Sequence, residues 1–289
     1  MEEADFLITY KRCTETNDDA IFQAFQIGFS DYIIKVEITK EIFIKNFFGR
    51  EGNSPEYSFI AFDEDKPVGL ILGGIKVYEG IKTLRCGALC VHPDYRGTEV
   101  SKKLFSLHKE TAIENNCRQL FLEVIVGNDR AINFYKKMGY EKVYDITYYS
   151  HQNPDDIDEV LPDDVTVEKI DMEVLKSFSC KVRDIHINWQ NDFDYIEKIT
   201  GQVHFGVFHG TELIGALSIN PIGKINFLWI ESGFRNRGIG RGLVSHAIKE
   251  LNLKKLAINF PNNASLMGFA KRLNFTKDSI SQYEMYLTL

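Results

Sequence analysis

The run Glu231-Ser-Gly-Phe-Arg-Asn-Arg-Gly-Ile-Gly-Arg-Gly-Leu243 lies between two apolar patterns of different period. Before it, the apolar stretch from Ile225 to Ile230 is typical of a buried strand, and after it apolar residues recur at helical spacing. A loop that opens a helix presents several backbone N–H groups where the helix dipole already favours an anion. Its glycines allow a ligand to approach the backbone closely, and its arginines add positive charge. The run therefore predicts a pyrophosphate-binding loop.

The sequence of this run matches neither of two common phosphate-binding motifs. The dinucleotide fingerprint G-x-G-x-x-G would need a glycine where Leu243 stands, and a P-loop would need Gly-Lys-Ser/Thr, which is absent here. An ordinary glycine-rich turn between a strand and a helix is the simplest alternative. A related arrangement earlier in the chain favours the functional interpretation.

The whole arrangement occurs twice. Residues 89–105 again read as a strand, a loop at Arg96 and a helix, 139 residues before Arg235. Residues 121–140 combine a strand, an N-x-x-A motif, an aromatic pair and Gly-Tyr, and residues 256–275 are a weaker version of the same pattern. Duplication at a domain-sized period predicts two copies of one fold rather than a solenoid.

The loop of Arg235, Gly238 and Gly240 resembles motif A of the GNAT acetyltransferases, R/Q-x-x-G-x-G/A, which cradles the pyrophosphate of acetyl-CoA. Residues 121–140 resemble motif B of the same family. Over nearly all of its length the chain resembles a tandem-domain GNAT N-acetyltransferase. The resemblance implies an α/β (α+β) fold of two GNAT domains, each a mixed, mostly antiparallel sheet flanked by helices, with acetyl-CoA as co-substrate.

The length of 289 residues is enough for two domains of ordinary size. We expect a first domain over residues 1–150, a linker over 151–164 and a second domain over 165–289. The linker is acidic and contains two prolines, a composition typical of a solvated connector.

Composition excludes several classes of function. A net charge of −7 and a pI near 5.6 argue against a nucleic-acid partner. The sequence shows no basic, apolar leader and no apolar run of about 18 residues, so we expect a cytoplasmic protein without a membrane partner. The five cysteines lack metal-type spacing and indicate reduced thiols rather than a metal site. The sequence does not indicate an oligomeric state.

The two loops are not equivalent. Glu99 occupies the position of Gly238, and Ser101 that of Gly240. A carboxylate at about 4 Å from a phosphate costs roughly 1 kcal/mol in water, and the conformational freedom of glycine is also lost. We therefore expect the cofactor mainly in the second domain. By resemblance, its contacts are Leu228, Trp229, Ile230, Arg235, Asn236, Arg237, Gly238, Ile239, Gly240, Arg241, Asn263 and Phe269.

The catalytic groups are less clearly marked. Tyr135 occupies the position where many family members carry a tyrosine that protonates the thiolate, whereas its counterpart in the second copy is Ala270. An aromatic packing under the next strand is an equally good interpretation of Tyr135. The position of the family's glutamate base holds Arg85 and Lys224. The remaining candidates are Glu231 and His204 as bases and Tyr283 as an acid.

These features predict an acetyl-CoA-dependent N-acetyltransferase that acts on a small-molecule or peptide amine. A non-catalytic acyl-CoA-binding or interaction protein is the alternative, because the intact loop and the tyrosine lie in different copies.

Overall fold

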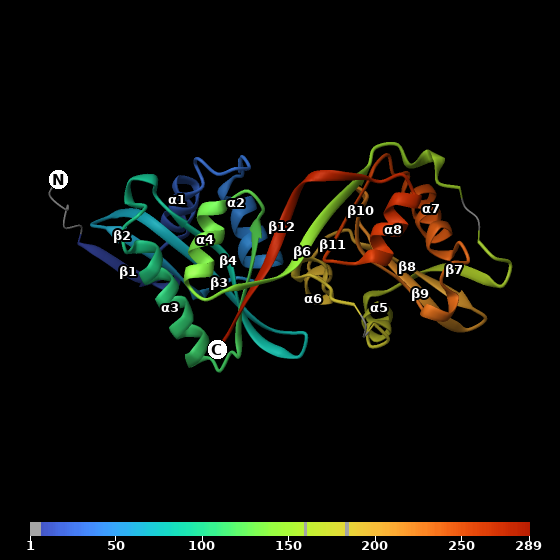
Figure 1. Cartoon of the computed structure of the whole chain (residues 1–289), viewed down its shortest axis with the longest axis horizontal. Coiled ribbons are helices and arrows are strands. Elements are labelled where there is room, and N and C mark those ends of the chain that lie inside the picture. The colour runs from blue at the N-terminus through green and yellow to red at the C-terminus, as the bar shows by residue number, and fades with distance from the viewer. Residues whose placement is uncertain (1–6, 159–160, 183–184) are drawn as a thin grey trace. The chain divides into compact units, whose positions relative to one another are not determined.

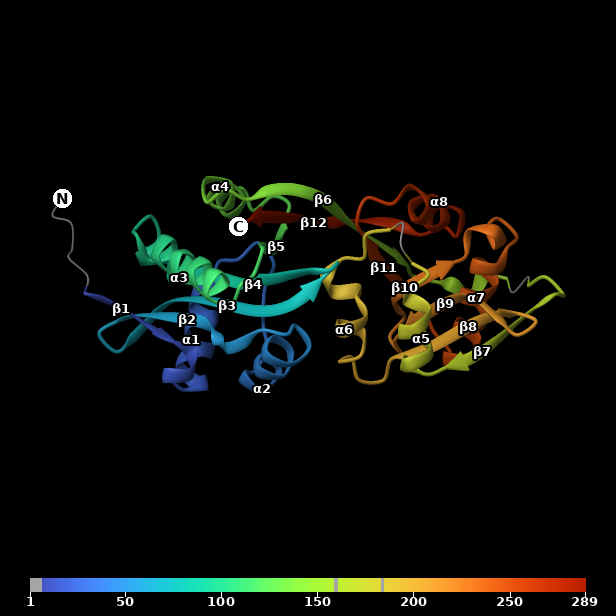
Figure 2. The same ribbon diagram turned by 90° about the horizontal axis from the view of Figure 1, so that it is seen from below.

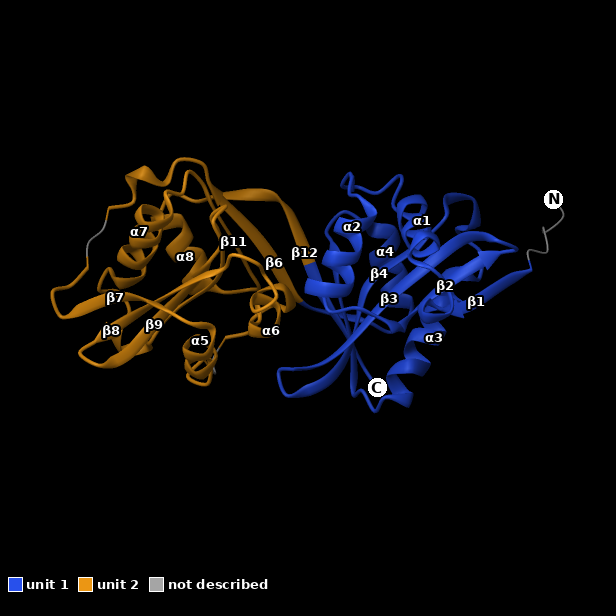
Figure 3. Cartoon of the chain, turned by 180° about the vertical axis from the view of Figure 1, so that it is seen from behind, with its two compact units in different colours: residues 1–143, 283–289 blue, residues 144–282 orange. Residues whose placement is uncertain are grey.

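The computed structural model describes residues 7–158, 161–182 and 185–289 (Figure 1). The chain divides into two compact units, which Figure 3 shows in different colours. Unit 1 consists of Met1–Val143 and Tyr283–Leu289, and unit 2 of Tyr144–Gln282. Within the described ranges, none of the helices combines the length and the apolar character that crossing a membrane requires.

Unit 1 contains a mixed sheet with helices on both faces. Its strands are β1 (Ile8–Arg12), β2 (Ser54–Asp63), β3 (Lys66–Tyr78), β4 (Ile81–Val91), β5 (Gln119–Ile125) and the end of β12 (Thr276–Thr288). Strands β1 to β4 pair antiparallel in chain order, and β4 pairs parallel with β5. Its helices are α1 (Asp18–Gly28), α2 (Lys40–Phe43) with a π-helical continuation (Ile44–Arg50), α3 (Val100–Glu114) and α4 (Asp129–Lys137).

Two apolar clusters bury the two faces of the unit 1 sheet. One cluster joins α1 and α2 to the sheet and includes Phe25 and Phe43, whose ring centroids lie 4.7 Å apart. The other joins α3 and α4 to the opposite face and includes Leu104 and Leu120. Figure 2 shows α1 and α2 on one side of these strands and α4 on the other. A sheet covered on both faces explains the long apolar runs in its strands.

Unit 2 repeats this order. Its strands are β7 (Val165–Ile170), β8 (Val203–His209), β9 (Glu212–Ile219), β10 (Lys224–Ile230) and β11 (Leu256–Phe260), and its helices are α5 (Met172–Ser179), α6 (Phe193–Ile196), α7 (Ile239–Leu251) and α8 (Ala264–Arg272). Strands β7 to β10 pair antiparallel, and β10 pairs parallel with β11. Short 3₁₀ turns occur at Cys13–Glu15, Pro93–Tyr95, Pro154–Asp156, Trp189–Asn191 and Ser232–Phe234. The expected class, mixed and mostly antiparallel sheets flanked by helices, is confirmed.

The final strand of each copy crosses to the other unit. From Tyr144 onward, β6 (Glu141–His151) belongs to unit 2, where it pairs with β11 and stacks Tyr149 on Phe260 at 5.3 Å. In return, the end of β12 belongs to unit 1 and places the fully buried Met285 in the core with Leu104. The expected boundaries, 1–150 and 165–289, differ from these units because an apolar strand pattern does not specify which sheet the strand joins.

The acidic segment 151–164 differs from a solvated connector where it is described. Ile157 is 5% exposed and belongs to the core of unit 2, and its carbonyl accepts a hydrogen bond from Ser245 Oγ at 2.6 Å. Asp164 accepts two hydrogen bonds from Arg237, at 2.7 and 2.8 Å. The acidic composition suggested exposure, but the buried Ile157 and the pairing of Arg237 with Asp164 hold the segment against the rest of unit 2.

Candidate functional site

A cavity in unit 2 lies where two parallel strands part. Strands β10 and β11 pair at Lys224 with Ala257 and at Ile225 with Ile258, whereas β10 continues to Ile230. Beyond this point the backbone edge of β10 borders a cavity of about 550 Å³. Its lining consists of Ile185, Leu228, Trp229, Ile230, Phe234, Arg235, Asn236, Gly238, Ile239, Gly240, Arg241, Asn263, Ser265, Leu266, Phe269, Arg272 and Leu273.

The loop that follows β10 has the backbone conformation of an anion site. Gly238 precedes the first residue of α7 and has a φ of +82°, in the left-handed region that favours glycine. Asn236 is also left-handed, with a φ of +62°. The first turn of α7 contains no acidic residue, so its N–H groups face the cavity without a competing carboxylate on that turn.

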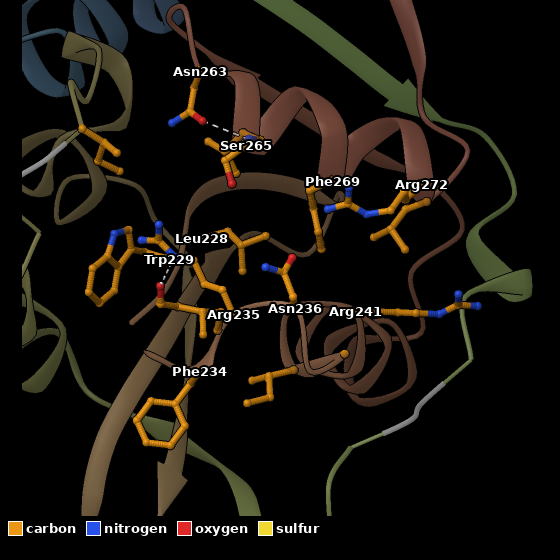
Figure 4. Close-up of a pocket in the computed structure, with 17 residues that line it drawn as sticks. Leu228, Trp229, Phe234, Arg235, Asn236, Arg241, Asn263, Ser265, Phe269 and Arg272 are labelled. Atoms are coloured by element: carbon orange, nitrogen blue, oxygen red, sulfur yellow. Dashed lines mark hydrogen bonds between the residues drawn. The ribbon is translucent and has the colours of Figure 1, made fainter. Parts of the chain in front are cut away.

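Three arginines from different elements line this cavity, and Figure 4 shows their side chains with the other lining residues. Arg235 Nε donates to the carbonyl of Ile230 at 2.7 Å, and its guanidinium lies 5.4 Å from the ring centre of Trp229. Arg241 comes from α7, where its guanidinium also lies 3.5 Å from a carboxylate oxygen of Asp158, and Arg272 comes from α8. The cavity therefore combines a helix N-terminus with three cationic groups, an arrangement suited to phosphate oxygens.

Eleven of the twelve residues predicted to contact the cofactor line this cavity, and Arg237 does not. Arg237 instead holds Asp164 in a two-point hydrogen bond, which lowers the pKa of that carboxyl below its ordinary value. Motif reasoning also missed Arg272. That residue lies three positions after Phe269 on α8, and this spacing, which puts two residues on one helix face, was the signal available in the sequence.

Helix packing accounts for two of the motif positions. A Cβ atom on Gly240 would lie 3.2 Å from the ring of Phe269, so a larger residue there would require the ring to shift by a few tenths of an ångström. Asn263 Oδ1 accepts from the N–H of Leu266 at 2.9 Å and caps α8, as Asn128 caps α4. Asn263 thus has a structural role in addition to its place in the cavity wall.

The first loop is arranged differently. Arg96 is bound by Asp31 through two hydrogen bonds of 2.5 and 2.6 Å and also donates to the carbonyl of Gly28 at 3.2 Å. Glu99 has a right-handed helical conformation, with a φ of −76°, where Gly238 is left-handed. The backbone conformation at this position therefore differs between the two loops. In addition, Arg96, the arginine of the first loop, already has Asp31 as its carboxylate partner.

The sequence model of the acetyltransferase (GNAT) family matches this chain in two stretches, residues 19–140 and 172–275. The chain belongs to this family. The two matched stretches correspond to the two copies, so the protein is a tandem GNAT chain.

Individual relatives agree with this assignment. The chain is 30% identical over 95 residues to an N-alpha-acetyltransferase 30 of Schizosaccharomyces pombe, an alignment that covers 31% of this chain and 63% of the relative. It is 32% identical over 95 residues to an acetyltransferase of Pectobacterium atrosepticum, covering 33% of this chain and 64% of that protein. The chain therefore spans less than two thirds of these relatives. A tandem GNAT protein from the clavulanic acid biosynthesis pathway has the same fold, with a TM-score of 0.68 and 12% identity over 97% of this chain and 98% of that one.

Tyr135 lies in the core of unit 1 of this GNAT chain. It is 7% exposed and packs in the same cluster as Leu104, and its hydroxyl lies 3.9 Å from Cys86 Sγ. Burial raises the pKa of Tyr135 well above the ordinary value for tyrosine. This environment matches the packing interpretation of the residue.

We expect Tyr135→Phe to leave turnover nearly unchanged and to cost about 1 kcal/mol of stability or less, because only one sulfur contact is lost. Steady-state kinetics together with thermal unfolding would measure both. A 100-fold fall in kcat with the fold intact would assign a general acid to unit 1 and contradict this expectation.

The other catalytic candidates do not line the cavity. Glu231 follows β10 directly, and its carboxylate is 3.4 Å from Lys181 Nζ. Tyr283 belongs to unit 1, where it packs against the core and lies under Lys142 at 4.4 Å. His204 is 9% exposed, with its Nδ1 2.9 Å from Ser218 Oγ, and burial lowers its pKa below the ordinary value. Their catalytic roles remain predictions.

Proposed function

We propose that the chain is an acetyl-CoA-dependent N-acetyltransferase whose co-substrate binds in unit 2. The observation that carries this proposal is the combination, in one cavity, of the left-handed Gly238 at the start of α7 with Arg235, Arg241 and Arg272. The acceptor is an amine of a small molecule or peptide, and the name of the Schizosaccharomyces pombe relative supports an amine.

The cavity has the features that acetyl-CoA requires. The N–H groups that begin α7 and the three arginines would hold the phosphates. The free backbone edge of β10 at Leu228, Trp229 and Ile230 would pair with the amide groups of the pantetheine arm. A backbone N–H on this edge would also polarise the thioester carbonyl.

The residues of the cavity determine how a proton can leave the amine. When bound, acetyl-CoA supplies an acyl group whose C–S bond breaks as the amine N–C bond forms, and the amine proton ends on the thiol. The described lining residues include no carboxylate and no histidine. An ammonium group with a pKa of about 10 must lose a proton before it can attack, so solvent or a group outside this lining accepts it.

The lack of a carboxylate or histidine among the described lining residues also favours the alternative function, an acyl-CoA-binding protein without turnover. The two functions make different predictions for a mixture of acetyl-CoA and amines. Formation of acetylated amine together with free thiol supports the transferase, whereas saturable CoA binding without either product supports the binding protein.

The duplicated loop offers a matched pair of variants for testing the site. We expect one CoA to bind per chain, and Arg235→Ala to weaken binding about 5-fold or more through loss of one charged contact. Arg96→Ala should leave the affinity unchanged, because Asp31 already occupies that guanidinium. Calorimetry measures stoichiometry and affinity together. Two equal sites, or a loss of binding only in the Arg96 variant, would refute the assignment to unit 2.

A further inference from the structure

Two of the three arginines line the end of the unit 2 cavity that lies away from Trp229. We call Arg241 and Arg272 the arginine pair; Arg241 comes from the first turn of α7 and Arg272 from the last turn of α8. Figure 4 shows both on the side of the cavity opposite Trp229 and Arg235. The guanidinium of Arg235 lies 5.4 Å from the Trp229 ring centre and is therefore separate from the arginine pair.

The contact between α7 and α8 brings the arginine pair to one edge of the cavity. At this contact a Cβ atom on Gly240 would lie 3.2 Å from the ring of Phe269. Arg241 directly follows Gly240, and Arg272 lies one helical turn after Phe269. A guanidinium nitrogen of Arg272 would lie 3.4 Å from a Cβ atom on Gly268, so this side chain folds back along α8 toward the helix end that lines the cavity. Both side chains therefore start from the same contact between the helices.

The arginine pair is accessible to an anion in the cavity. Arg272 is exposed and forms no hydrogen bond or ion pair with any residue that the structure describes. Arg241 lies 3.5 Å from a carboxylate oxygen of Asp158, whose side chain is 78% exposed. A surface pair of this kind contributes little stability, so a more highly charged anion can take the place of Asp158.

The order of the groups along CoA matches their order along the cavity. In the proposed binding mode, the pantetheine arm pairs with β10 at Leu228, Trp229 and Ile230, and the pyrophosphate lies on the N–H groups that begin α7. The ribose with its 3′-phosphate follows the pyrophosphate in CoA. It therefore extends past the loop, away from Trp229, to the end of the cavity where the arginine pair lies.

The 3′-phosphate is the most highly charged group of CoA. As a phosphomonoester it carries a charge of about −1.5 to −2 at pH 7, whereas each phosphate of the pyrophosphate is esterified further and carries a single charge. A guanidinium binds such a group through two parallel, charge-assisted hydrogen bonds. The backbone N–H groups of the loop can hold the pyrophosphate, which leaves the arginine pair for the 3′-phosphate.

Unit 1 has lysines at the equivalent positions. Lys102 aligns with Arg241, and its Nζ lies 2.6 Å from a carboxylate oxygen of Glu99. Lys137 aligns with Arg272. A lysine ammonium does not form the two parallel hydrogen bonds of a guanidinium, and Glu99 already neutralises Lys102. The arginine pair is thus a property of the second copy.

We propose that the arginine pair is the subsite for the ribose 3′-phosphate of the acyl donor, and that Arg272 makes unit 2 selective for donors with this group. CoA thioesters carry the 3′-phosphate, whereas thioesters of dephospho-CoA lack it. The alternative is that all three arginines contact the pyrophosphate, which dephospho-CoA retains. This inference rests on the proposed binding of CoA in unit 2.

Calorimetry with CoA and dephospho-CoA isolates the 3′-phosphate, because the two nucleotides differ only in that group. We expect the wild-type chain to bind CoA at least about tenfold more tightly than dephospho-CoA. Arg272→Ala should reduce this ratio to within about threefold, because the affinity for CoA falls much more than that for dephospho-CoA. Arg272→Lys retains the charge without the two-point hydrogen bond and should give an intermediate ratio.

The matched control is Lys271→Ala, which removes one positive charge from the neighbouring position of α8. Lys271 is exposed and does not line the cavity, so the ratio should stay as in the wild-type chain. A wild-type ratio near one, or an equal loss of affinity for both nucleotides in Arg272→Ala, overturns the inference while CoA binding still supports the proposed function. Absence of binding by both nucleotides refutes the proposed function, and this inference with it.

Discussion

Replacement of Gly238 by glutamate should weaken CoA binding by about 1–3 kcal/mol, or roughly 5- to 150-fold. The change copies Glu99 of the first loop into the second. Two effects add: a φ of +82° is unfavourable for a residue with a side chain, and a carboxylate enters the wall of a cavity lined by three arginines. Calorimetry and the CoA-induced increase in Tm would both report the loss.

Two further variants separate these effects. Gly238→Ala introduces the backbone strain without the charge and should retain part of the affinity. Gly233→Glu adds the same charge in the same loop, at an exposed position where a Cβ atom meets nothing within 4 Å and which does not line the cavity. We expect Gly233→Glu to bind CoA almost normally. An unchanged Tm increase for Gly238→Glu would show that this loop is not the cofactor site.

Removal of the last seven residues, Tyr283–Leu289, should unfold unit 1 although these residues follow unit 2 in the sequence. The segment places Met285, which is fully buried, in the unit 1 core, and Tyr283 and Leu287 pack against the same cluster. Truncating one buried methionine to alanine costs about 2–5 kcal/mol, and the deletion also removes two partly buried side chains from the same cluster. It also leaves β5 with an exposed edge.

The point variant Met285→Ala keeps this test quantitative if the truncated chain aggregates. We expect a loss of about 2–5 kcal/mol, with faster amide hydrogen exchange in β3 and β4 than in β9. The exposed Thr288→Ala on the same strand serves as the control and should stay within about 0.5 kcal/mol of wild type. Destabilisation confined to unit 2 would contradict the exchange of final strands.

The sequence located the loop that lines the cavity because the determinants of this loop are local. The strand ending at Ile230, the helix beginning at Ile239 and the glycine between them are neighbours in the chain, so their backbone chemistry can be inferred from order alone. The repeat then located both copies, and the substitution at Glu99 distinguished them. The same reasoning placed eleven predicted residues around one cavity.

The tertiary structure decided every feature that depends on which distant segments meet. The apolar patterning of the sequence predicted the last strand of each copy but not the sheet that it joins. The exchange that buries Met285 in unit 1 could therefore not be predicted. The pairing of Arg237 with Asp164 joins segments 73 residues apart, and the hydrogen bond from Asn191 to the carbonyl of Asn259 joins segments 68 residues apart. Local sequence determines backbone conformation and helix ends, whereas the partners of buried polar groups are determined only when the sheet brings those segments together.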